Sequence, residues 1–325
     1  MKFTILGPGA VGCYLAGMLG RRGHEISVLA RGARAAAIRT DGIRLTRKDE
    51  AGTTVVRPAV VEAPDALGAP DAAFVCVKAY SVPMLVPALA ALSRAGTTIV
   101  FVQNGIPWWY LASAAGEGSA LDPGGAIAAA VAPERVVGCV TYVNARNAGP
   151  GIIEHVGDDT FVLGRPNGAE DATLAGIVAA MADAGIAARA STELRRDIWL
   201  KLWGNLAFNP ISALTGATMD KIIAEPDTRP LVMAMMREAQ ALVGADGIQF
   251  PLTIEQRLEI GAKAGAFKTS MLQDLEAGRP LEIDAIIGAV SEYGRRLGVA
   301  TPAIDTVLGL IRQKARGLGL AAVTQ

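Results

Sequence analysis

The sequence is poor in the residues that most often build metal centres and catalytic triads. It contains 2 histidines in 325 residues, which leaves little material for a histidine-based metal site or a Ser-His-Asp triad. Its 3 cysteines, Cys13, Cys76 and Cys139, are far apart, and their spacing matches no metal-binding motif. An odd number of scattered cysteines also argues against a disulfide framework, so we expect a reduced, cytoplasmic protein without a metal.

Excess charge and long apolar runs are missing as well. Lys and Arg number 31 and Asp and Glu number 31, so no net field would attract nucleic acid or an anionic membrane surface. No window reaches the roughly 18 near-continuous apolar residues of a membrane span. Residues 3–20 could be mistaken for a signal peptide, but a strand, a glycine turn and a helix explain this apolar run better. With 51% hydrophobic residues, the 325-residue chain is suited to two folded domains.

The N-terminus carries a glycine motif in the setting of a dinucleotide-binding fold. A β-rich run at Lys2–Leu6 precedes the spacing G-x-G-x-x-G, and a helical pattern to about residue 22 and a second strand at 25–30 follow it. The first glycine permits a tight turn, the second lets a pyrophosphate approach, and the third allows close helix–strand packing, while the helix start offers free N–H groups. The expected phosphate-binding residues are Gly7, Gly9, Ala10, Val11 and Gly12.

The end of the second strand indicates which dinucleotide is bound. Binders of NAD usually place an acidic residue there to hold the ribose 2′-hydroxyl. This chain has Arg31, followed by Arg34, and no acid. Either the two arginines are solvated loop residues, or Arg31, helped by Arg34, pairs with a 2′-phosphate. We favour the second interpretation and expect NADP(H) as the cofactor.

Two further buried strands end in polar residues. Residues 72–77 lead to Lys78 and residues 97–102 lead to Gln103 and Asn104. Ligands of open α/β sheets bind beyond the carboxyl ends of the strands, so Lys78 and Asn104 are candidates to contact cofactor or substrate. Residues 43–45 and 53–56 are expected to form a small hairpin or an excursion before the sheet resumes. Strands at 136–143, 151–156 and 160–163 are expected to join the sheet as antiparallel additions.

Beyond about residue 190 helical periodicity replaces strand signals. The fold class predicted is therefore α/β, with a Rossmann-type dinucleotide-binding domain at 1–190 and an all-helical substrate domain at 191–325. The helices are expected at 193–214, 228–246, 253–277, 282–298 and 303–316. Their apolar faces would serve either the domain's own core or a homodimer interface, and the sequence does not separate the two.

The first of these helices carries a polar stripe on an otherwise apolar surface. Lys201, Asn205 and Asn209 recur every four residues and therefore share one helix face. Unpaired burial of these groups would cost several kcal/mol, so they are either paired with one another, solvated, or turned toward a polar cavity. Farther on, Glu282 and Asp284 stand where acids complement the start of a helix, which by itself would explain both.

Together these residues resemble the ketopantoate reductase (2-dehydropantoate 2-reductase) family, essentially from end to end of the chain. The matching stretches are the glycine motif with Arg31, Val-Lys78-Ala, Gln-Asn104-Gly, Lys201-x3-Asn205-x3-Asn209, Ser270-Met-Leu-Gln-Asp274 and Glu282-Ile-Asp284. The run from Lys201 and the last two blocks are far more specific than the glycine motif.

The resemblance implies a Rossmann-type domain, a helical domain and an active site in the cleft between them. It implies that a small 2-oxo acid, 2-dehydropantoate of pantothenate biosynthesis, is reduced to the 2-hydroxy acid by hydride from NADPH. Lys201 is the implied general acid, and Glu282 would hydrogen-bond the substrate hydroxyl and influence the protonation of Lys201. The implied substrate-binding residues are Asn104, Asn205, Asn209 and Ser270, and Lys78 with Asn104 would bridge cofactor and substrate.

The chain departs from the family pattern at a few positions. The family often has histidine where Gln103 stands and asparagine where Ile287 stands, and the Trp108-Trp109 pair with the small residues after it is unusual. Such changes bear on the substrate pocket, where swapping a polar for an apolar residue can alter preference strongly. The chain could therefore be an NAD(P)-dependent D-2-hydroxyacid dehydrogenase that acts on another branched or bulky 2-oxo acid. An alternative of a different class is a non-catalytic NADP(H)-binding sensor that keeps the fold and has lost the reaction.

Overall fold

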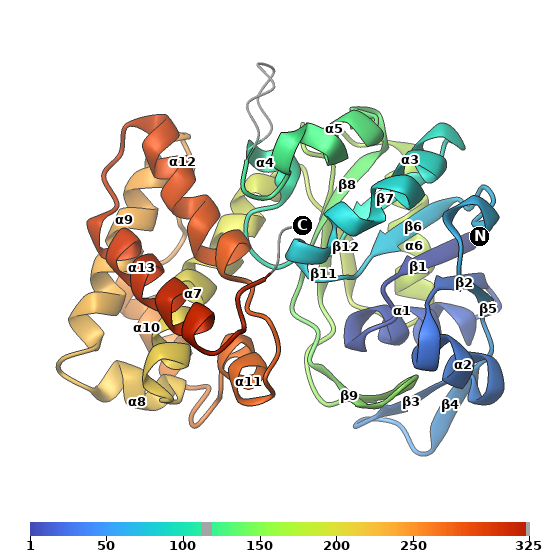
Figure 1. Ribbon diagram of the computed structural model, residues 1–325, viewed down its shortest axis with the longest axis horizontal. Coiled ribbons are helices and arrows are strands. Elements are labelled where there is room, and N and C mark those ends of the chain that lie inside the picture. Colours follow the sequence, from blue (N-terminus) through green and yellow to red (C-terminus); the bar gives the residue numbers. More distant parts are fainter. Residues whose placement is uncertain (112–118, 323–325) are drawn as a thin grey trace. The chain divides into compact units, whose positions relative to one another are not determined.

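The chain divides into two compact units, each with its own interior. The computed structural model describes residues 1–111 and 119–322. The first unit comprises Met1–Gln103 and Gly124–Leu194, and the second comprises Asn104–Pro123 and Arg195–Gln325 (Figure 1). The α/β class of the first unit and the helical character of the second confirm the predicted fold class.

An eight-stranded sheet forms the centre of the first unit. Its spatial order is β12-β11-β8-β7-β6-β1-β2-β5, and every neighbouring pair is parallel except β8 with β11. The chain proceeds from β1 outward in one direction and returns to the other side of β1 with β6, which makes the β1–β6 boundary a topological switch point. The strands are β1 (Lys2–Leu6), β2 (Glu25–Leu29), β5 (Ala59–Val61), β6 (Ala72–Val75), β7 (Thr98–Phe101), β8 (Val136–Thr141), β11 (Phe161–Gly164) and β12 (Ala188–Ala190).

A smaller sheet of order β4-β3-β10-β9 completes the strands of this unit. Its members are β3 (Ile43–Arg47), β4 (Thr53–Val56), β9 (Ala145–Gly149) and β10 (Ile152–His155). The predicted β3–β4 hairpin is confirmed, because the two strands pair antiparallel. The prediction that β10 adds to the main sheet is wrong, since it pairs parallel with β3 and antiparallel with β9. Its alternating burial records one covered face and carries no information about which strand lies beside it.

The strand predicted from 136 onward needs a second correction. We expected it to add antiparallel, whereas β8 pairs parallel with β7 and is antiparallel only to its other neighbour, β11. A parallel pairing requires a crossover between the two strands, and the chain from β7 to β8 includes such a connection. The strand signal at 136–143 gave the element but could not give its direction relative to β7.

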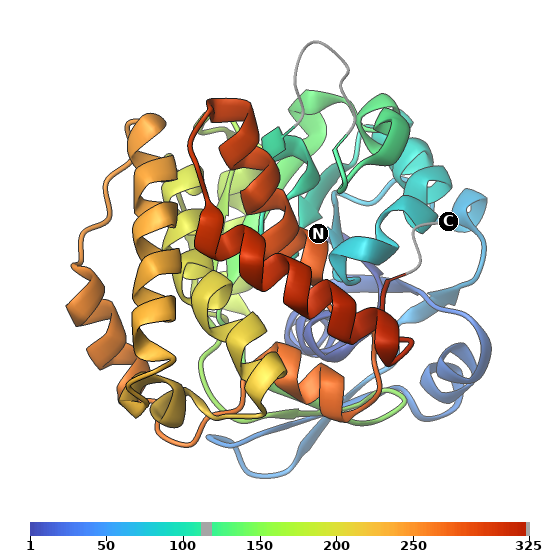
Figure 2. The same cartoon turned by 60° about the vertical axis from the view of Figure 1, so that its left-hand side comes forward.

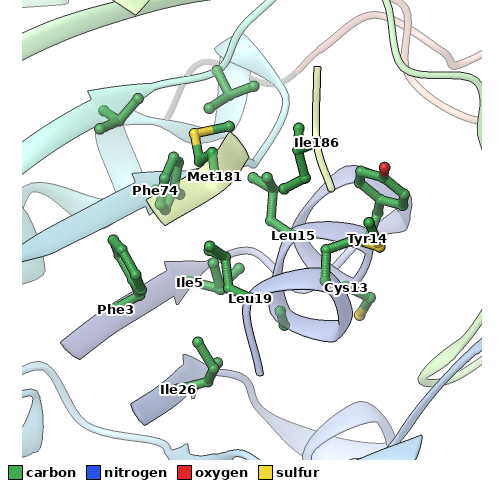
Figure 3. Packing of buried hydrophobic residues seen from close by; sticks show 14 of the residues in the cluster. Phe3, Ile5, Cys13, Tyr14, Leu15, Leu19, Ile26, Phe74, Met181 and Ile186 are labelled. Carbon is green, nitrogen blue, oxygen red and sulfur yellow. The ribbon is translucent and has the colours of Figure 1, made fainter. Parts of the chain in front are cut away.

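Helices cover the sheet of the first unit and supply its core. They are α1 (Ala10–Gly20), α2 (Gly32–Asp41), α3 (Val86–Arg94), α5 (Ala126–Ala130) and α6 (Ala172–Asp183), with short 3₁₀ turns η1 (Pro64–Ala66), η2 (Ala79–Ser81), η3 (Pro83–Leu85), η4 (Pro123–Gly125) and η5 (Pro133–Arg135). Figure 3 shows Leu15 and Leu19 of α1 facing Phe3 and Ile5 of β1, with Met181 of α6 nearby. This buried apolar contact holds α1 against β1.

The second unit contains only helices and turns among its described elements (Figures 1 and 2). They are α4 (Trp108–Leu111), α7 (Leu194–Thr215), α8 (Met219–Ala224), α9 (Arg229–Ala245), α10 (Ile254–Ala262), α11 (Ser270–Glu276), the π-helical turn η6 (Asp284–Gly288), α12 (Ala289–Leu297) and α13 (Pro302–Gly317). In Figure 2, α13 is drawn in dark red, and it packs against α9 and α12. None of the helices in the described stretches is both long and apolar enough to cross a membrane.

Two of the predicted helices differ from the structure. The helix expected at 253–277 is two helices, α10 and α11, because Gly265 has φ +62° and Thr269 then begins a new helix by accepting from Leu272 N–H. The helix expected at 282–298 starts later, as the π-helical turn η6 that continues into α12. Helix α8 was not predicted from the sequence.

The segment after β7 packs with the helices of the second unit. The Ile106 N–H donates to the Ala285 carbonyl at 2.8 Å, and the Tyr110 hydroxyl donates to Asp246 at 3.0 Å. The indole N–H of Trp199 donates to the Tyr110 hydroxyl at 2.8 Å. The sequence-based division placed 104–123 in the first domain. In the structure this segment belongs to the second unit, because its hydrogen bonds run to residues of that unit that are far away in the chain.

Candidate functional site

At two of the three positions of the glycine motif in the first unit, a side chain would clash with neighbouring atoms. Gly7 follows β1 with φ +93°, and a Cβ there would lie 2.4 Å from Val77 Cγ1. A Cβ on Gly12 would lie 2.4 Å from the Gly7 carbonyl oxygen. Gly9 is different, since no described atom lies within 4 Å of its Cβ position. The outer two glycines therefore permit close packing, and the middle one leaves the helix start uncovered.

The start of α1 is suited to a phosphate. Gly9 is the N-cap and makes no side-chain cap, and the first turn holds no acidic residue. The N–H groups of the first helical residues, Ala10, Val11 and Gly12, have no acceptors within the helix. These donors and the positive end of the helix dipole favour an anion at this position.

Two arginines lie beside this turn. Arg31 is the N-cap residue of α2, exposed, with Nε donating to the Glu62 carbonyl at 3.3 Å. Arg34, in the first turn of α2, donates from Nη1 to the carbonyl of Pro8 inside the glycine motif. From the sequence we expected Arg34 only to help Arg31, but the structure brings its guanidinium onto the glycine turn. Both cations thus lie next to the uncovered start of α1.

The ends of β6 and β7 are tied together by Gln103. Its Nε2 donates to the carbonyls of Val75 and Val77, at 2.7 and 3.2 Å. Lys78 follows at once as the N-cap of η2 and is half-buried. Gln103, which departs from the family pattern, therefore fixes the strand end that carries Lys78. This role of Gln103 could not be predicted from the sequence, because the sequence does not show which backbone carbonyls a side-chain amide will reach.

Helix α7 of the second unit presents the predicted polar face. Its apolar residues Trp199, Leu202, Trp203 and Leu206 are each 1% exposed or less. Lys201 and Asn205 are half-buried, and the Lys201 ammonium donates to Asn104 Oδ1 at 2.5 Å. The structure thus brings together two predicted site residues that lie on different elements.

Asn209 stands out on the same face. Its side chain is 4% exposed, and its Nδ2 is buried without a hydrogen-bond partner among the described residues. An orphaned buried donor costs about 1–3 kcal/mol and is rare in native proteins. A ligand or an ordered water that accepts from Nδ2 would remove this cost.

The remaining predicted residues lie at the starts of two short elements. Ser270 is the first residue of α11 and is exposed, while the neighbouring Thr269 makes the cap. Glu282 is 6% exposed and comes two residues before η6. Asp284 begins η6 and pairs with Arg312 at 2.6 Å. Asp284 is therefore a structural ion pair, whereas the buried carboxylate of Glu282 remains a candidate for contact with a ligand.

Three of the residues at which the chain departs from the family pattern are buried. Trp108 and Trp109 are both buried in α4, and Ile287 is fully buried in η6. The small-residue stretch that follows the tryptophans lies largely in 112–118, outside the described residues.

Two family models match the chain. The model described as ketopantoate reductase PanE/ApbA matches residues 3–168, and the one described as ketopantoate reductase PanE/ApbA C terminal matches 193–315. A protein named 2-dehydropantoate 2-reductase from Mesorhizobium japonicum is 44% identical, over 97% of this chain and 98% of the relative. This chain belongs to the ketopantoate reductase family.

Solved structures agree with this membership of the ketopantoate reductase family. A candidate ketopantoate reductase from Ralstonia solanacearum MolK2 superposes with a TM-score of 0.92 at 40% identity, covering 98% of this chain and 99% of that one. D-mandelate dehydrogenase, in a ternary structure with NADH and anilino(oxo)acetate, gives a TM-score of 0.82 over 98% and 100% of the two chains. At 21% identity, the second likeness is one of fold alone. The protein is an oxidoreductase of the 2-dehydropantoate 2-reductase type.

Proposed function

We propose that this protein reduces 2-dehydropantoate to pantoate with NADPH. The observation that carries the proposal is the polar face of α7, where Lys201 donates to Asn104 and Asn209 holds an unsatisfied amide among the described residues. A family-wide reaction on a 2-oxo acid needs a proton donor and hydrogen-bond donors for a carboxylate, and this face has both. The name of the relative from Mesorhizobium japonicum supports the choice of substrate.

Lys201 is the proposed general acid. NADPH supplies hydride to the carbonyl carbon, and the carbonyl oxygen needs a proton to become the hydroxyl of the product. The Lys201 ammonium can give that proton, and its charge stabilises the negative charge that develops on the oxygen. Asn104 Oδ1 accepts one N–H bond of Lys201 at 2.5 Å, which orients the ammonium.

The other polar residues of the second unit are proposed to hold the substrate. Asn209 Nδ2, buried without a described partner, would donate to the substrate carboxylate, joined by Asn205 and Ser270. The buried carboxylate of Glu282 would accept from the hydroxyl groups of the substrate or product.

The first unit is proposed to bind the cofactor and to select NADPH. The pyrophosphate would accept hydrogen bonds from the N–H groups of residues 10–12 at the start of α1. Arg31 and Arg34 would pair with the 2′-phosphate, and no acid stands at the end of β2 to hold a free 2′-hydroxyl. Lys78, held in place by the Gln103 bonds, would contact the nicotinamide half. The free thiols of all three cysteines fit a reducing, cytoplasmic location.

A panel assay tests the proposal. Purified protein is mixed with NADPH or NADH and with a series of 2-oxo acids that includes 2-dehydropantoate, and oxidation of the cofactor is followed. Selective turnover of 2-dehydropantoate with NADPH is the expected result. Turnover of only another 2-oxo acid would move the assignment to a D-2-hydroxyacid dehydrogenase, and cofactor binding without turnover of any acid would indicate a sensor.

Lys201→Ala tests the role of the general acid within the same assay. We expect kcat to fall by roughly 10²–10⁴-fold, the usual contribution of a positioned acid, while NADPH still binds. Lys201→Arg is the matched control, since it keeps the charge but holds its proton too tightly to donate it. Turnover close to normal in Lys201→Ala would overturn the assignment.

A further inference from the structure

The backbone of Gly105 lies directly against another backbone in the second unit. Gly105 has φ +87°, and a Cβ at this position would lie 2.2 Å from the Ala285 carbonyl oxygen and 3.0 Å from Ile286 N. These neighbours are main-chain atoms, which cannot move aside as a flexible side chain can. No residue with a side chain fits here without displacing the segment.

The surface that Gly105 contacts is the π-helical turn η6. Ala289 N–H donates to the Asp284 carbonyl, five residues back, instead of to Ala285 as in an α-helix. The Ala285 carbonyl is thereby released from its usual α-helical donor, and it accepts from Ile106 N–H at 2.8 Å. The change of helical register thus creates the acceptor that holds the segment after β7.

The residue on the other side of Gly105 is Asn104. Its Oδ1 accepts from the Lys201 ammonium at 2.5 Å. The contact with η6 therefore fixes the backbone next to the amide that meets Lys201. Glu282 is also buried and precedes η6 by two residues in the same stretch of chain.

We propose that Gly105, seated on the π-helical turn η6, is a positioning residue that holds the Asn104 amide against the Lys201 ammonium. Gly105 itself contacts no substrate; it acts through Asn104. The inference rests on the proposed function in treating Lys201 as the proton donor. If the π-helical turn served only the stability of the fold, Asn104, the neighbour of Gly105, would not need to bind Lys201.

The test compares the variant Gly105→Ala with an alanine variant of another glycine, one that also has a positive φ but no atoms packed against its Cβ position. Gly298 has φ +67° and no described atom within 4 Å of its Cβ position, so Gly298→Ala carries the left-handed strain alone. We expect kcat of Gly105→Ala to fall by about 10²-fold, the loss typical of an ångström-scale misplacement, with NADPH affinity unchanged. Gly298→Ala should keep kcat close to the parent value.

A double-mutant cycle separates positioning from a general loss of structure. In the Asn104→Ala background, Gly105→Ala should lower kcat little further, because the residue through which it acts is gone. Independent, multiplying losses would overturn the proposal. If Gly105→Ala does not fold, an amide-to-ester replacement at Ile106 exchanges the N–H that binds the Ala285 carbonyl for an oxygen without adding a side chain, and it is measured in the same cycle.

A second measurement does not depend on turnover. The rate at which an amine-specific reagent labels Lys201 is measured against pH by mass spectrometry of its peptide. The labelling rate of Lys201 should change by a similar factor in Gly105→Ala and in Asn104→Ala, and it should stay unchanged in Gly298→Ala. Parent-like labelling of Gly105→Ala would overturn the positioning role even in an active reductase. Altered labelling in a protein that reduces no 2-oxo acid would sustain the positioning role and overturn the proposed function.

Discussion

Asn209, which we propose holds the substrate, also has a cost in stability. Its buried Nδ2 lacks a partner among the described residues, whereas Lys201 on the same helix face is held by Asn104. A donor that is buried and unsatisfied destabilises the folded chain unless a ligand or water accepts its proton. Such a conflict between stability and local packing is the kind expected where a substrate completes the site, as we propose for Asn209.

Asn209→Leu should separate these two effects. Leucine has nearly the same shape and removes the orphaned donor, so the free energy of unfolding should stay constant or rise by about 1 kcal/mol. The KM for the 2-oxo acid should rise, because the proposed donor to its carboxylate is lost. Urea denaturation and steady-state kinetics measure the two quantities.

Asn205→Leu is the matched control, since Asn205 is half-buried and carries no such orphaned atom. It should raise KM without raising stability. A loss of stability well above 1 kcal/mol in Asn209→Leu would mean that an ordered water already satisfies Nδ2.

Helix α6 illustrates how the ends of an element are stabilised. Asp171 is its N-cap, and its Oδ1 accepts from Leu174 N–H at 2.8 Å. Its Oδ2 accepts from Arg165 Nε at 2.7 Å, and Arg165 also donates to the carbonyls of Glu134 and Val136. The cap thus connects α6 to the start of β8. The hydrogen bond from Arg165 lowers the pKa of Asp171 below its usual range.

This lowered pKa predicts a pH-dependent contribution to stability. Because the folded-state pKa lies below the unfolded one, about 3.9, the stabilisation is present above that value and is lost as the pH falls through the folded pKa. Asp171→Ala should lower the free energy of unfolding by about 1 kcal/mol at pH 7, and the difference should shrink below pH 4. Urea denaturation at a series of pH values measures it.

Asp171→Asn distinguishes the cap from the charge. Asparagine caps a helix about as well as aspartate, so this variant should lose only the ion pair with Arg165 and remain more stable than Asp171→Ala. A constant gap between the parent and Asp171→Ala from pH 7 to pH 3 would contradict the assignment.

At the scale of the molecule, the two units hold separate parts of the proposed chemistry. The phosphate-binding turn and its arginines belong to the first unit, and Lys201 with its neighbours belongs to the second. Each unit has its own buried core, so a ligand that binds one unit should stabilise that unit whether or not the other is competent in catalysis.

Thermal unfolding tests this division of roles. NADPH at about 100 times its Kd adds about 2.7 kcal/mol of stability, enough to raise the Tm by several degrees. Lys201→Ala should keep the full rise. The double variant Arg31→Gln with Arg34→Gln should lose most of the NADPH effect and leave any NADH effect unchanged, because only NADPH has the 2′-phosphate. Equal losses for both cofactors would mean that the arginines support the fold rather than the phosphate.

The sequence predicted the elements that local chemistry controls. The glycine turn, the strands before and after it and the spacing of Lys201, Asn205 and Asn209 were all found where expected. Turn geometry and periodicity of burial depend on residues close together in the chain, so they can be inferred without knowing the fold. The α/β and helical halves, and the family, followed from the same local signals.

Only the tertiary structure decided which distant groups meet. Three contacts join segments that are separate in the chain. They are the pairing of β10 with β3, the hydrogen bond from Arg34 to the Pro8 carbonyl, and the close approach of Gly105 to Ala285. Alternating burial along a strand shows that one face is covered, but it does not show which element covers it. Likewise, the identity of a side-chain amide does not show which acceptor it will bind. The sequence therefore determined which residues this reductase family member has for its chemistry. Packing between distant elements decided how Asn104, Gly105 and Lys201 are brought together, because such contacts exist only once the chain has folded.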